Sequence, residues 1–325
     1  MKKKLIVITS GSGNSGTGAI HDYLSNRPDF NSPFFGQEFR LISDPYGIEN
    51  LYNNFFHNFS INNSSEALDQ FKQYSLDFLK IKYRDKKIIY NEKNFLNEVS
   101  NYIKNIKKLE YSGYPQYKRV SKSNTINTVF KIKKIFMKMK NHEFHENKMF
   151  LSVKEKEFIK STKNFLTSIM SINLKEKKNN KNIILDQSTN FWKPEIALKY
   201  FNSPKILLIN RDPRGVYYSM RSRQSFSYPG YDINLFVHWY QNIMDRRKIV
   251  TKKYKNNIRE INFEKFLLNF NNEKKKLNSF LKISNKMPSN FNHEISIKNI
   301  FKAEKFLSNN DLKLIKKKLK KHLVW

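Results

Sequence analysis

The sequence predicts a three-layer α/β fold, in which a central, mainly parallel sheet is flanked by helices and interrupted by a mainly helical insertion. Short apolar, β-branched runs alternate with segments of helical spacing at both ends of the chain, which is typical of a parallel sheet covered on both faces. Between them, residues 60–180 show chiefly helical periodicity. We expect one α/β domain over residues 1–325 that contains this insertion.

The elements of the α/β part follow from apolar runs and their boundary residues. Strands are expected at 4–10, 182–186, 205–209 and 258–263. Helices are expected at 17–26, 194–201, 214–223, 232–254, 264–270, 272–282 and 308–322. In the insertion, helical spacing begins near residue 62 with Ser64 or Ser65 as N-cap, continues at 92–109, and returns at 152–173 with Ser152 as N-cap.

The chain is strongly basic, with 61 Lys and Arg against 28 Asp and Glu and a formal charge of +33. Such a charge favours nucleic acid, an anionic membrane surface or an anionic substrate as partner. Lysine, asparagine and isoleucine are all abundant, however, as an A/T-rich genome would produce, so the lysine excess is weak support for any partner. Arginines are more informative: four of the 11 lie within thirteen residues, namely Arg211, Arg214, Arg221 and Arg223.

Two absences narrow the class of protein. The sequence has no cysteine, which excludes disulfides, cysteine-ligated zinc and thiol nucleophiles. No run approaches the roughly 20 apolar residues of a membrane span. We expect a cytoplasmic protein, whose lysines could hold it peripherally at the inner membrane face.

The first strand runs into a glycine-rich loop. Four of the nine glycines of the chain fall between Gly11 and Gly18, and helical spacing begins directly afterwards. A strand, a glycine loop and a helix N-terminus form an anion site, because the backbone N–H groups turn inward and the helix end adds partial positive charge. The alternative is a flexible turn. Thr17 stands where a Walker A motif has lysine, so we expect anion binding without the usual nucleotide-hydrolysing chemistry.

A second motif follows the strand at 205–209. Arg211 comes just past the carboxyl end of this strand, where open α/β sheets bind ligands. Pro213 opens a helix, and Ser219 lies within it. A strand-end arginine and a serine on the next helix can converge on one phosphate. The alternative is an Arg-Asp pair that only caps the helix.

The two motifs together resemble the sulfotransferases that use 3′-phosphoadenylyl sulfate (PAPS), with the closest likeness to their carbohydrate-type and bacterial members. The resemblance implies a P-loop NTPase-like fold and no metal. It assigns the 5′-phosphosulfate to the first loop and the 3′-phosphate to Arg211 and Ser219. The expected loop residues are Gly13, Asn14, Ser15, Gly16, Thr17 and Gly18. Trp239 and the segment 261–267, with Phe263 in a tyrosine position, extend the likeness to about a third of the chain.

One residue departs from the family pattern. Sulfotransferases usually carry Lys or Arg directly before Ser-Gly-Thr, where the charge stabilises the leaving phosphate oxygen; here that residue is Asn14. An amide donates a hydrogen bond but carries no charge, so either another cation replaces it or the transfer is impaired. The candidates for the replacement cation are Arg40, Lys193 and Arg214.

The remaining site residues are assigned by role. Glu38 is the expected general base, because carbohydrate-type members place a glutamate after the first helix; Asp186 is the second choice, and a surface ion pair of Glu38 with Arg40 is the alternative reading. Gln187 is expected at the pocket mouth, and Arg221 and Arg223 are expected to meet an anionic acceptor.

The sequence therefore predicts a PAPS-dependent sulfotransferase that acts on a hydroxyl, on a carbohydrate of a cell-surface glycan or its precursor. Two other functions remain open. One is a nucleotide-binding protein of the same fold that has lost catalysis, which Asn14 supports. The other is a nucleic-acid or membrane-surface binding protein, which the charge supports; we expect no specific nucleic acid as partner.

Overall fold

The computed structural model of the chain describes residues 4–83, 86–87, 89, 91–113, 147–174, 181–223 and 228–324, together with residues 128, 132 and 135. The described chain divides into two compact units. Residues 1–40 and 173–325 form an α/β unit, and residues 41–172 form a mainly helical unit. The single domain over residues 1–325, with an insertion at 60–180, stays a prediction.

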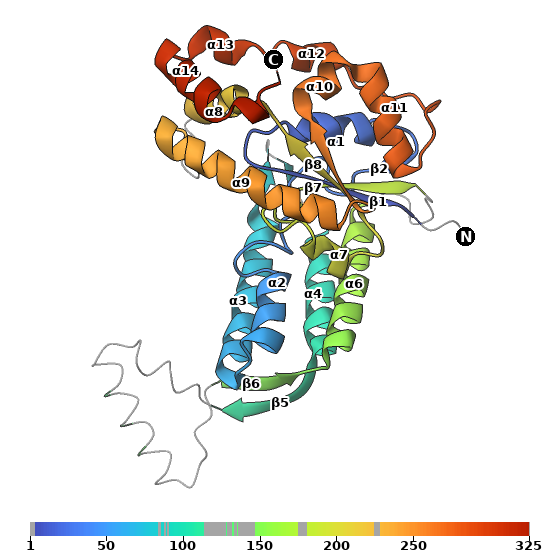
Figure 1. Cartoon of the computed structure of the whole chain (residues 1–325). Helices are drawn as coiled ribbons and strands as arrows, with labels where there is room; N and C mark the ends of the chain where they lie inside the picture. The colour runs from blue at the N-terminus through green and yellow to red at the C-terminus, as the bar shows by residue number, and fades with distance from the viewer. Residues whose placement is uncertain are drawn as a thin grey trace. The chain divides into compact units, whose positions relative to one another are not determined.

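The α/β unit is built on a five-stranded sheet in the order β2-β7-β1-β8-β9 (Figure 1). Its strands are β1 (Ile6–Gly11), β2 (Phe30–Asn31), β7 (Asn182–Asp186), β8 (Lys205–Asn210) and β9 (Ile258–Asn262). Every neighbouring pair of this sheet is parallel. The predicted central parallel sheet is therefore confirmed, and β2 is an edge strand that the sequence did not indicate.

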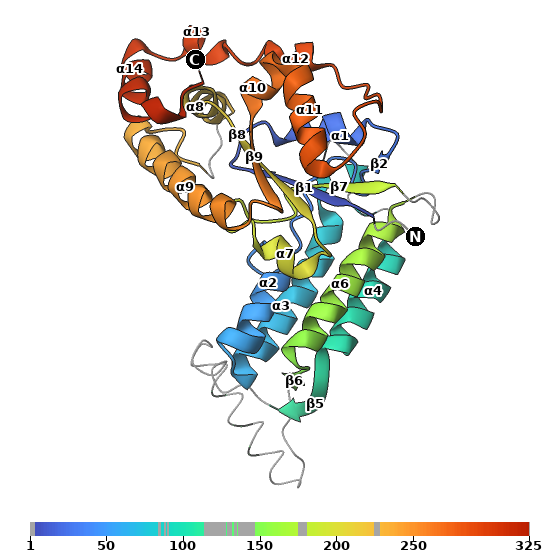
Figure 2. The ribbon, with the colours of Figure 1, turned by 45° about the vertical axis from the view of Figure 1, so that its right-hand side comes forward.

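Helices cover both faces of this sheet, as the fold class predicts (Figure 2). In chain order they are α1 (Thr17–Ser25), α7 (Ile196–Tyr200), α8 (Pro213–Ser222), α9 (Ile233–Lys253), α10 (Phe263–Leu268), α11 (Phe270–Leu281), α12 (His293–Ile297), α13 (Lys302–Phe306) and α14 (Asn309–Lys318). One apolar core joins α1, α10 and α11 to the sheet through residues such as Ile20, Leu207 and Phe266. A second core joins α8 and α9 to the C-terminal helices, with Tyr217 and Phe236 at its centre.

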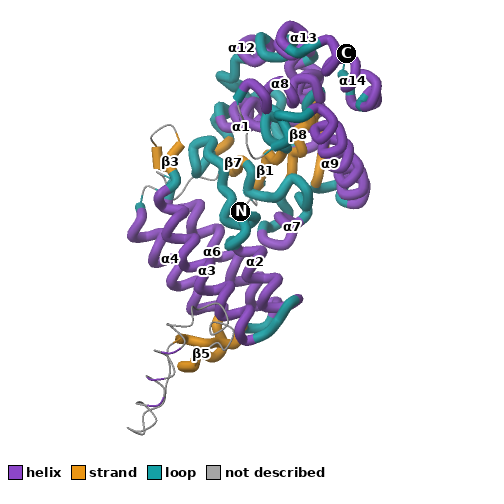
Figure 3. The backbone as a smooth tube through the Cα atoms, turned by 90° about the vertical axis from the view of Figure 1, so that its left-hand side faces the viewer, coloured by secondary structure: helices purple, strands orange, loops and turns teal. Residues whose placement is uncertain are grey.

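The helical unit consists mainly of long helices that lie side by side (Figure 3). The long helices are α3 (Ile61–Lys80), α4 (Glu92–Ile106) and α6 (Glu155–Ile172), and they are preceded by the short α2 (Ile48–Tyr52) and a π-helical turn (Asn53–His57). The unit also contains two short antiparallel pairs, which are β3 (Lys82–Tyr83) with β4 (Lys86–Lys87) and β5 (Lys107–Gly113) with β6 (Asn147–Ser152). Stacked rings such as Tyr102 on Phe165, 4.3 Å between centroids, hold the helices together.

Two helix starts in this unit differ from the expected ones. Ser60, and not Ser64 or Ser65, caps α3 by accepting a hydrogen bond from the Asn63 N–H, and the other two serines are buried inside the helix. Ser152 ends β6, and α6 begins three residues later at Glu155. In both places a serine competent to cap was present, but strand pairing or packing fixed the start of the helix elsewhere.

Candidate functional site

The glycine-rich loop joins β1 to α1 with a backbone path that few residues can follow. Asn14 has φ 64° and Gly16 has φ 89°, so two residues of the loop lie in the left-handed region. At Gly13 a Cβ atom would lie only 2.3 Å from the Tyr228 ring. At Gly16 it would lie equally close to the ring of Phe263. The loop is thus held between two aromatic side chains, and its glycines are required by space as well as by backbone angle.

The polar groups of this loop suit an anion. The hydroxyl oxygen of Ser15 is buried without a hydrogen-bond partner among the described residues. The first turn of α1 contains no acidic residue, and its N-cap Gly16 provides no side-chain acceptor for the helix amides. A buried hydroxyl and a row of amide donors together form a cradle for phosphate oxygens. The residues present therefore fit the 5′-phosphosulfate that the sequence resemblance assigns to them.

Arg211 connects the loop to the second motif. Its Nη1 donates to Ser219 Oγ over 2.9 Å and to the carbonyl oxygen of Asn14 over 3.0 Å. The arginine and the serine thus converge as the sequence predicts. The alternative reading also holds in part, because Asp212 caps α8 by accepting from the Arg214 N–H. Gly215 leaves the space for the guanidinium, since a Cβ there would lie 2.8 Å from Arg211 Nε.

Arg211 is buried, and no carboxylate of the described residues forms a hydrogen bond with it. It is 8% exposed, and its Nε lacks a hydrogen-bond partner among the described residues. The nearest carboxylate is Glu264, whose Oε1 lies 3.7 Å from Nε. Burial lowers the pKa of Arg211, and the neighbouring positive charge of Arg223 lowers it further. A buried arginine with donors to spare is what a bound phosphate needs.

Arg214, by contrast, is fully engaged. It donates to both carboxylate oxygens of Asp212 over 2.8 Å and to Glu304 over 2.7 Å. The side chain is 1% exposed, so it has no surface to offer a ligand. Of the three candidates for the missing cation, Arg214 therefore lies in an internal ion-pair network. Lys193 lies in the turn between β7 and α7.

Glu264 is a buried acidic residue whose charge acts on both Arg211 and Arg214. Its carboxylate is fully buried and accepts from the Asp212 N–H with both oxygens over 3.1 Å. Burial raises the pKa of Glu264 to about 7, and the backbone hydrogen bonds and Arg211 act against that rise. The glutamate supports the turn after β8 and sets the position of Arg211 from below.

Asp186 and Glu38 lie together at the end of β7. The backbone of Glu38 forms an isolated parallel bridge with Asp186, and the Phe39 N–H donates to the Asp186 carbonyl over 2.9 Å. Burial raises the pKa of Asp186 to about 6, while the Thr9 hydroxyl, which donates to its carboxylate over 2.7 Å, lowers it. Both candidates for the general base therefore belong to one cluster.

The side chain of Glu38 makes the ion pair that the sequence left open. Its Oε2 lies 3.4 Å from Arg40 Nη1, and both side chains are 51% exposed. At that exposure the pair contributes little to stability, so either group can exchange its partner for a ligand.

Gln187 contacts the start of the glycine-rich loop, and its expected place at the pocket mouth stays a prediction. Its side-chain amide donates to the Gly11 carbonyl and accepts from the Gly11 N–H, both over 3.3 Å. The residue has φ 51°, in the left-handed region of the backbone. Gln187 therefore fixes where the loop leaves the sheet.

The two remaining arginines of the cluster have separate partners. Arg221 Nη1 donates to Asp311 Oδ2 over 3.1 Å, which ties α8 to α14. Arg223 Nη1 donates to Asn14 Oδ1 over 3.1 Å. The structure thus brings Arg223, which the sequence assigned to the acceptor, to the position where the loop lacks a charge.

Tyr228 is a site residue that the sequence did not indicate. Its ring covers Gly13, and it packs edge-on against Trp239 with 5.6 Å between centroids. Burial raises the pKa of Tyr228, and the Arg40 guanidinium and the Gly13 N–H oppose this rise. The signal in the sequence was only a Tyr-Pro-Gly turn, which predicts a bend but not what it covers.

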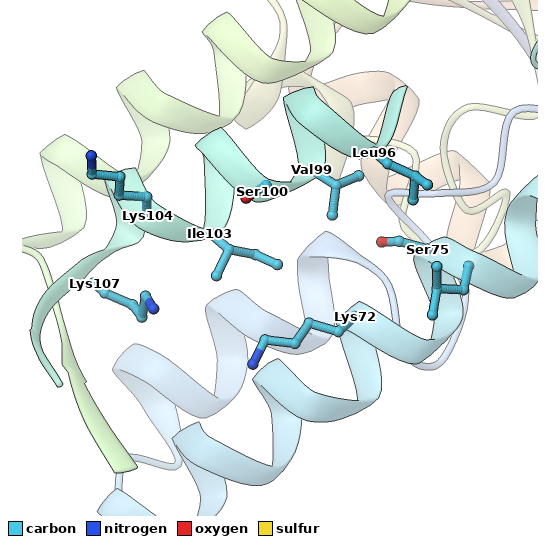
Figure 4. A pocket seen from close by; sticks show the side chains of 9 residues that line it. Lys72, Ser75, Leu96, Val99, Ser100, Ile103, Lys104 and Lys107 are labelled. Carbon is cyan, nitrogen blue, oxygen red and sulfur yellow. The ribbon is translucent and has the colours of Figure 1, made fainter. Parts of the chain in front are cut away.

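A pocket elsewhere contains none of the predicted site residues. It lies between α3 and α4 of the helical unit and has a volume of about 510 Å³ (Figure 4). Its lining combines apolar side chains with three lysines: Lys72, Ser75, Leu76, Leu96, Val99, Ser100, Ile103, Lys104 and Lys107. Two of these lysines already pair with carboxylates, Lys72 with Asp69 and Lys107 with Glu110.

Two classes of feature are not found in the described part of the chain. No group of three or more His, Cys, Asp or Glu side chains there could hold a metal ion. None of the helices described is both long and apolar enough to cross a membrane.

Comparison with known proteins gives solved structures alone. No protein-family model and no curated protein matches this chain. The sulfotransferase domain of the Synechococcus PCC 7002 olefin synthase aligns with a TM-score of 0.47 at 10% identity, covering 98% of this chain and 96% of that one. The sulfotransferase domain from the curacin biosynthetic pathway gives 0.44 at 13% identity, with 98% of both chains covered. Sulfotransferase STF1 from Mycobacterium tuberculosis H37Rv gives 0.43 at 10%, covering 97% of this chain and 76% of that one.

The three structures named here are sulfotransferases or sulfotransferase domains.

Proposed function

We propose that this protein is a sulfotransferase that uses PAPS and transfers the sulfuryl group to a hydroxyl. The observation that carries the proposal is the position of Arg211, which contacts both Ser219 and the Asn14 carbonyl. One buried guanidinium thereby spans the two motifs that would hold opposite ends of a nucleotide with two phosphate groups. The spare Nε of Arg211 and the buried Ser15 hydroxyl leave hydrogen-bonding capacity at each end.

The roles of the residues follow from their places. Arg211 and Ser219 would hold the 3′-phosphate, and the loop residues 13–18 would hold the 5′-phosphosulfate through backbone amides. PAPS supplies an activated sulfuryl group, so the protein must orient the acceptor, remove its proton and stabilise charge on the leaving oxygen. Glu38, half exposed, is the proposed base, and the buried Asp186 beside it is the second choice.

The acceptor and the cellular setting are part of this proposal. A carbohydrate hydroxyl of a cell-surface glycan or its precursor is the proposed acceptor, on the resemblance to carbohydrate-type members. We place the reaction in the cytoplasm, with peripheral contact at the inner membrane face through the exposed basic helix α14, whose last turn carries Lys316, Lys317 and Lys318.

Binding of adenosine 3′,5′-bisphosphate, measured by calorimetry, tests the nucleotide site. We expect the wild-type protein to bind it and Arg211→Ala to bind at least about 100-fold more weakly, because a buried charge-assisted contact to phosphate is lost. Arg259→Ala is the matched control, since it removes an arginine that donates to the Lys276 carbonyl. Absence of binding by the wild type, or equal affinity for Arg211→Ala, would contradict the proposal.

A second function is favoured by one observation. Asn14 leaves the loop without its usual cation, which suits a nucleotide-binding protein that has lost transfer. Tight binding of the bisphosphate without sulfate transfer to any member of a broad glycan set would support this second function. A steep salt-dependent affinity for random DNA would instead support a nucleic-acid binding protein.

A further inference from the structure

Two arginines, Arg211 and Arg223, donate hydrogen bonds to Asn14 of the glycine-rich loop. Arg211 donates to the main-chain oxygen of Asn14 over 3.0 Å, and Arg223 donates to its side-chain oxygen over 3.1 Å. Asn14 itself has φ 64°, which turns this residue away from the ordinary backbone path. The neutral residue at the position of the missing cation is therefore in direct contact with a guanidinium from a distant part of the chain.

The fold delivers Arg223 to this place through α8. Arg223 is the C-cap of that helix, and its N–H donates to the Ser219 carbonyl over 3.2 Å. Residues four apart lie on the same face of a helix, so Arg223 shares the face of Ser219 that is turned to the loop. The helix whose serine contacts Arg211 thus also presents a positive charge to the loop.

Among the described residues, no acidic side chain forms an ion pair with Arg223, and its contact on the loop is an amide oxygen. The guanidinium is close enough to Arg211 to lower the pKa of that residue. Two like charges at one loop are unfavourable unless an anion lies between or beside them. Arg221, two residues earlier, shows the opposite arrangement because it pairs with Asp311.

We propose that Arg223 supplies the positive charge that the loop lacks at Asn14. This rests on the proposed function. As the acceptor oxygen bonds to sulfur, the bond from sulfur to the bridging oxygen breaks and its electron pair stays on the phosphate. The proton of the acceptor hydroxyl passes to the carboxylate base. Arg223, already at the loop, stabilises the charge that develops on that phosphate oxygen.

Binding measurements separate this role from that of Arg211. For Arg223→Ala we expect at least about tenfold weaker binding of adenosine 3′,5′-bisphosphate, because one charge-assisted contact is lost. Binding of adenosine 3′-phosphate should stay within about twofold, since that ligand has no 5′-phosphate to meet the arginine. Arg211→Ala should weaken both ligands, and Arg259→Ala should weaken neither. If Arg223→Ala weakens both ligands alike, or neither, the proposal is wrong.

Two substitutions distinguish charge from bracing of the loop. Arg223→Gln can still donate to Asn14 but is neutral, whereas Arg223→Lys keeps the charge. We expect the turnover rate of the glutamine variant to fall at least about tenfold more than that of the lysine variant. A glutamine variant as active as wild type would show that Arg223 only braces the loop.

A charge transplant completes the test. In the Arg223→Ala background, Asn14→Lys restores a cation at the same loop, so it should recover the 5′-phosphate contribution to binding and part of the turnover. A folded double variant with no recovery of either would overturn the proposal. A wild-type protein that binds neither nucleotide would instead overturn the proposed function, so the two failures are distinguishable.

Discussion

Arg211 and Arg214 lie three residues apart at the same strand end, yet their surroundings are opposite. All three nitrogens of the Arg214 guanidinium donate to carboxylates. Nε and Nη2 donate to Asp212, and Nη1 donates to Glu304. Arg211 is also buried, but within the described part of the chain its closest ion-pair partner is Glu264, 3.7 Å from Nε, and Nε has no hydrogen-bond partner there. Arg214 therefore stabilises the fold through internal ion pairs, and Arg211 is the arginine that we propose for ligand binding.

Replacing Arg214 should have the largest effect on stability. We expect Arg214→Ala to lower the free energy of unfolding by about 3–5 kcal/mol, because it leaves the buried Asp212 carboxylate without its positively charged partner. Arg211→Ala should cost clearly less, since no hydrogen-bonded carboxylate is orphaned. Urea unfolding of the two variants measures this difference. Equal losses, or a larger loss for Arg211→Ala, would break the comparison.

The pH dependence of stability should reveal Asp186. Its pKa in the folded protein is about 6, against 3.8 for an ordinary aspartate, so between these values the folded state holds a proton that the unfolded state has released. Stability from this group therefore falls as pH rises through that window, by roughly 2–3 kcal/mol in total.

Asp186→Asn should remove this contribution. The test compares the free energies of unfolding of the variant and the wild type, measured with urea at several pH values between pH 4 and pH 6. The difference between the two proteins should change with pH across this range. Glu264 contributes with the same sign at higher pH, and so only the difference is informative. Asp245→Asn, at an exposed position of α9, is the control and should follow wild type. A constant difference across the window would argue against a buried, protonated Asp186.

Ser219 should give the smallest effect and sharpen the role of Arg211. Ser219→Ala removes one hydroxyl that contacts Nη1, so binding of adenosine 3′,5′-bisphosphate should weaken about five- to tenfold, as for a single hydrogen bond. Binding of adenosine 5′-phosphate should not change, because this ligand has no 3′-phosphate. Calorimetry with both ligands checks the prediction, and equal weakening of the two would place Ser219 outside the 3′-phosphate site.

The central strands of the sheet could be predicted because each has a clear signal in the sequence. β1, β7 and β8 are apolar runs that end at a glycine or polar residue, and each was expected within one or two residues of its observed bounds. The pair of β5 and β6 was not predicted. Residues of β5 are mostly exposed and form no apolar run, and its partner strand begins 34 residues after β5 ends.

The site divides in the same way. Arg211 and Ser219 belong to one strand–turn–helix unit, so their convergence follows from local spacing. The contact of Arg223 with Asn14 joins residues 209 positions apart, and that of Tyr228 with Gly13 depends on the same tertiary packing. The local sequence pattern therefore predicted a contact within one strand–turn–helix segment, but not the contacts between segments that are distant in the sequence.

The contacts that hold the glycine-rich loop have a consequence for the entropy of ligand binding. Gln187 fixes the loop at Gly11 from both sides, and the rings of Tyr228 and Phe263 close against its glycines. A loop held in this way has little conformational freedom left to surrender when a phosphate arrives. If this loop binds phosphate as proposed, we expect ordering of the chain to add only a small entropic penalty to binding.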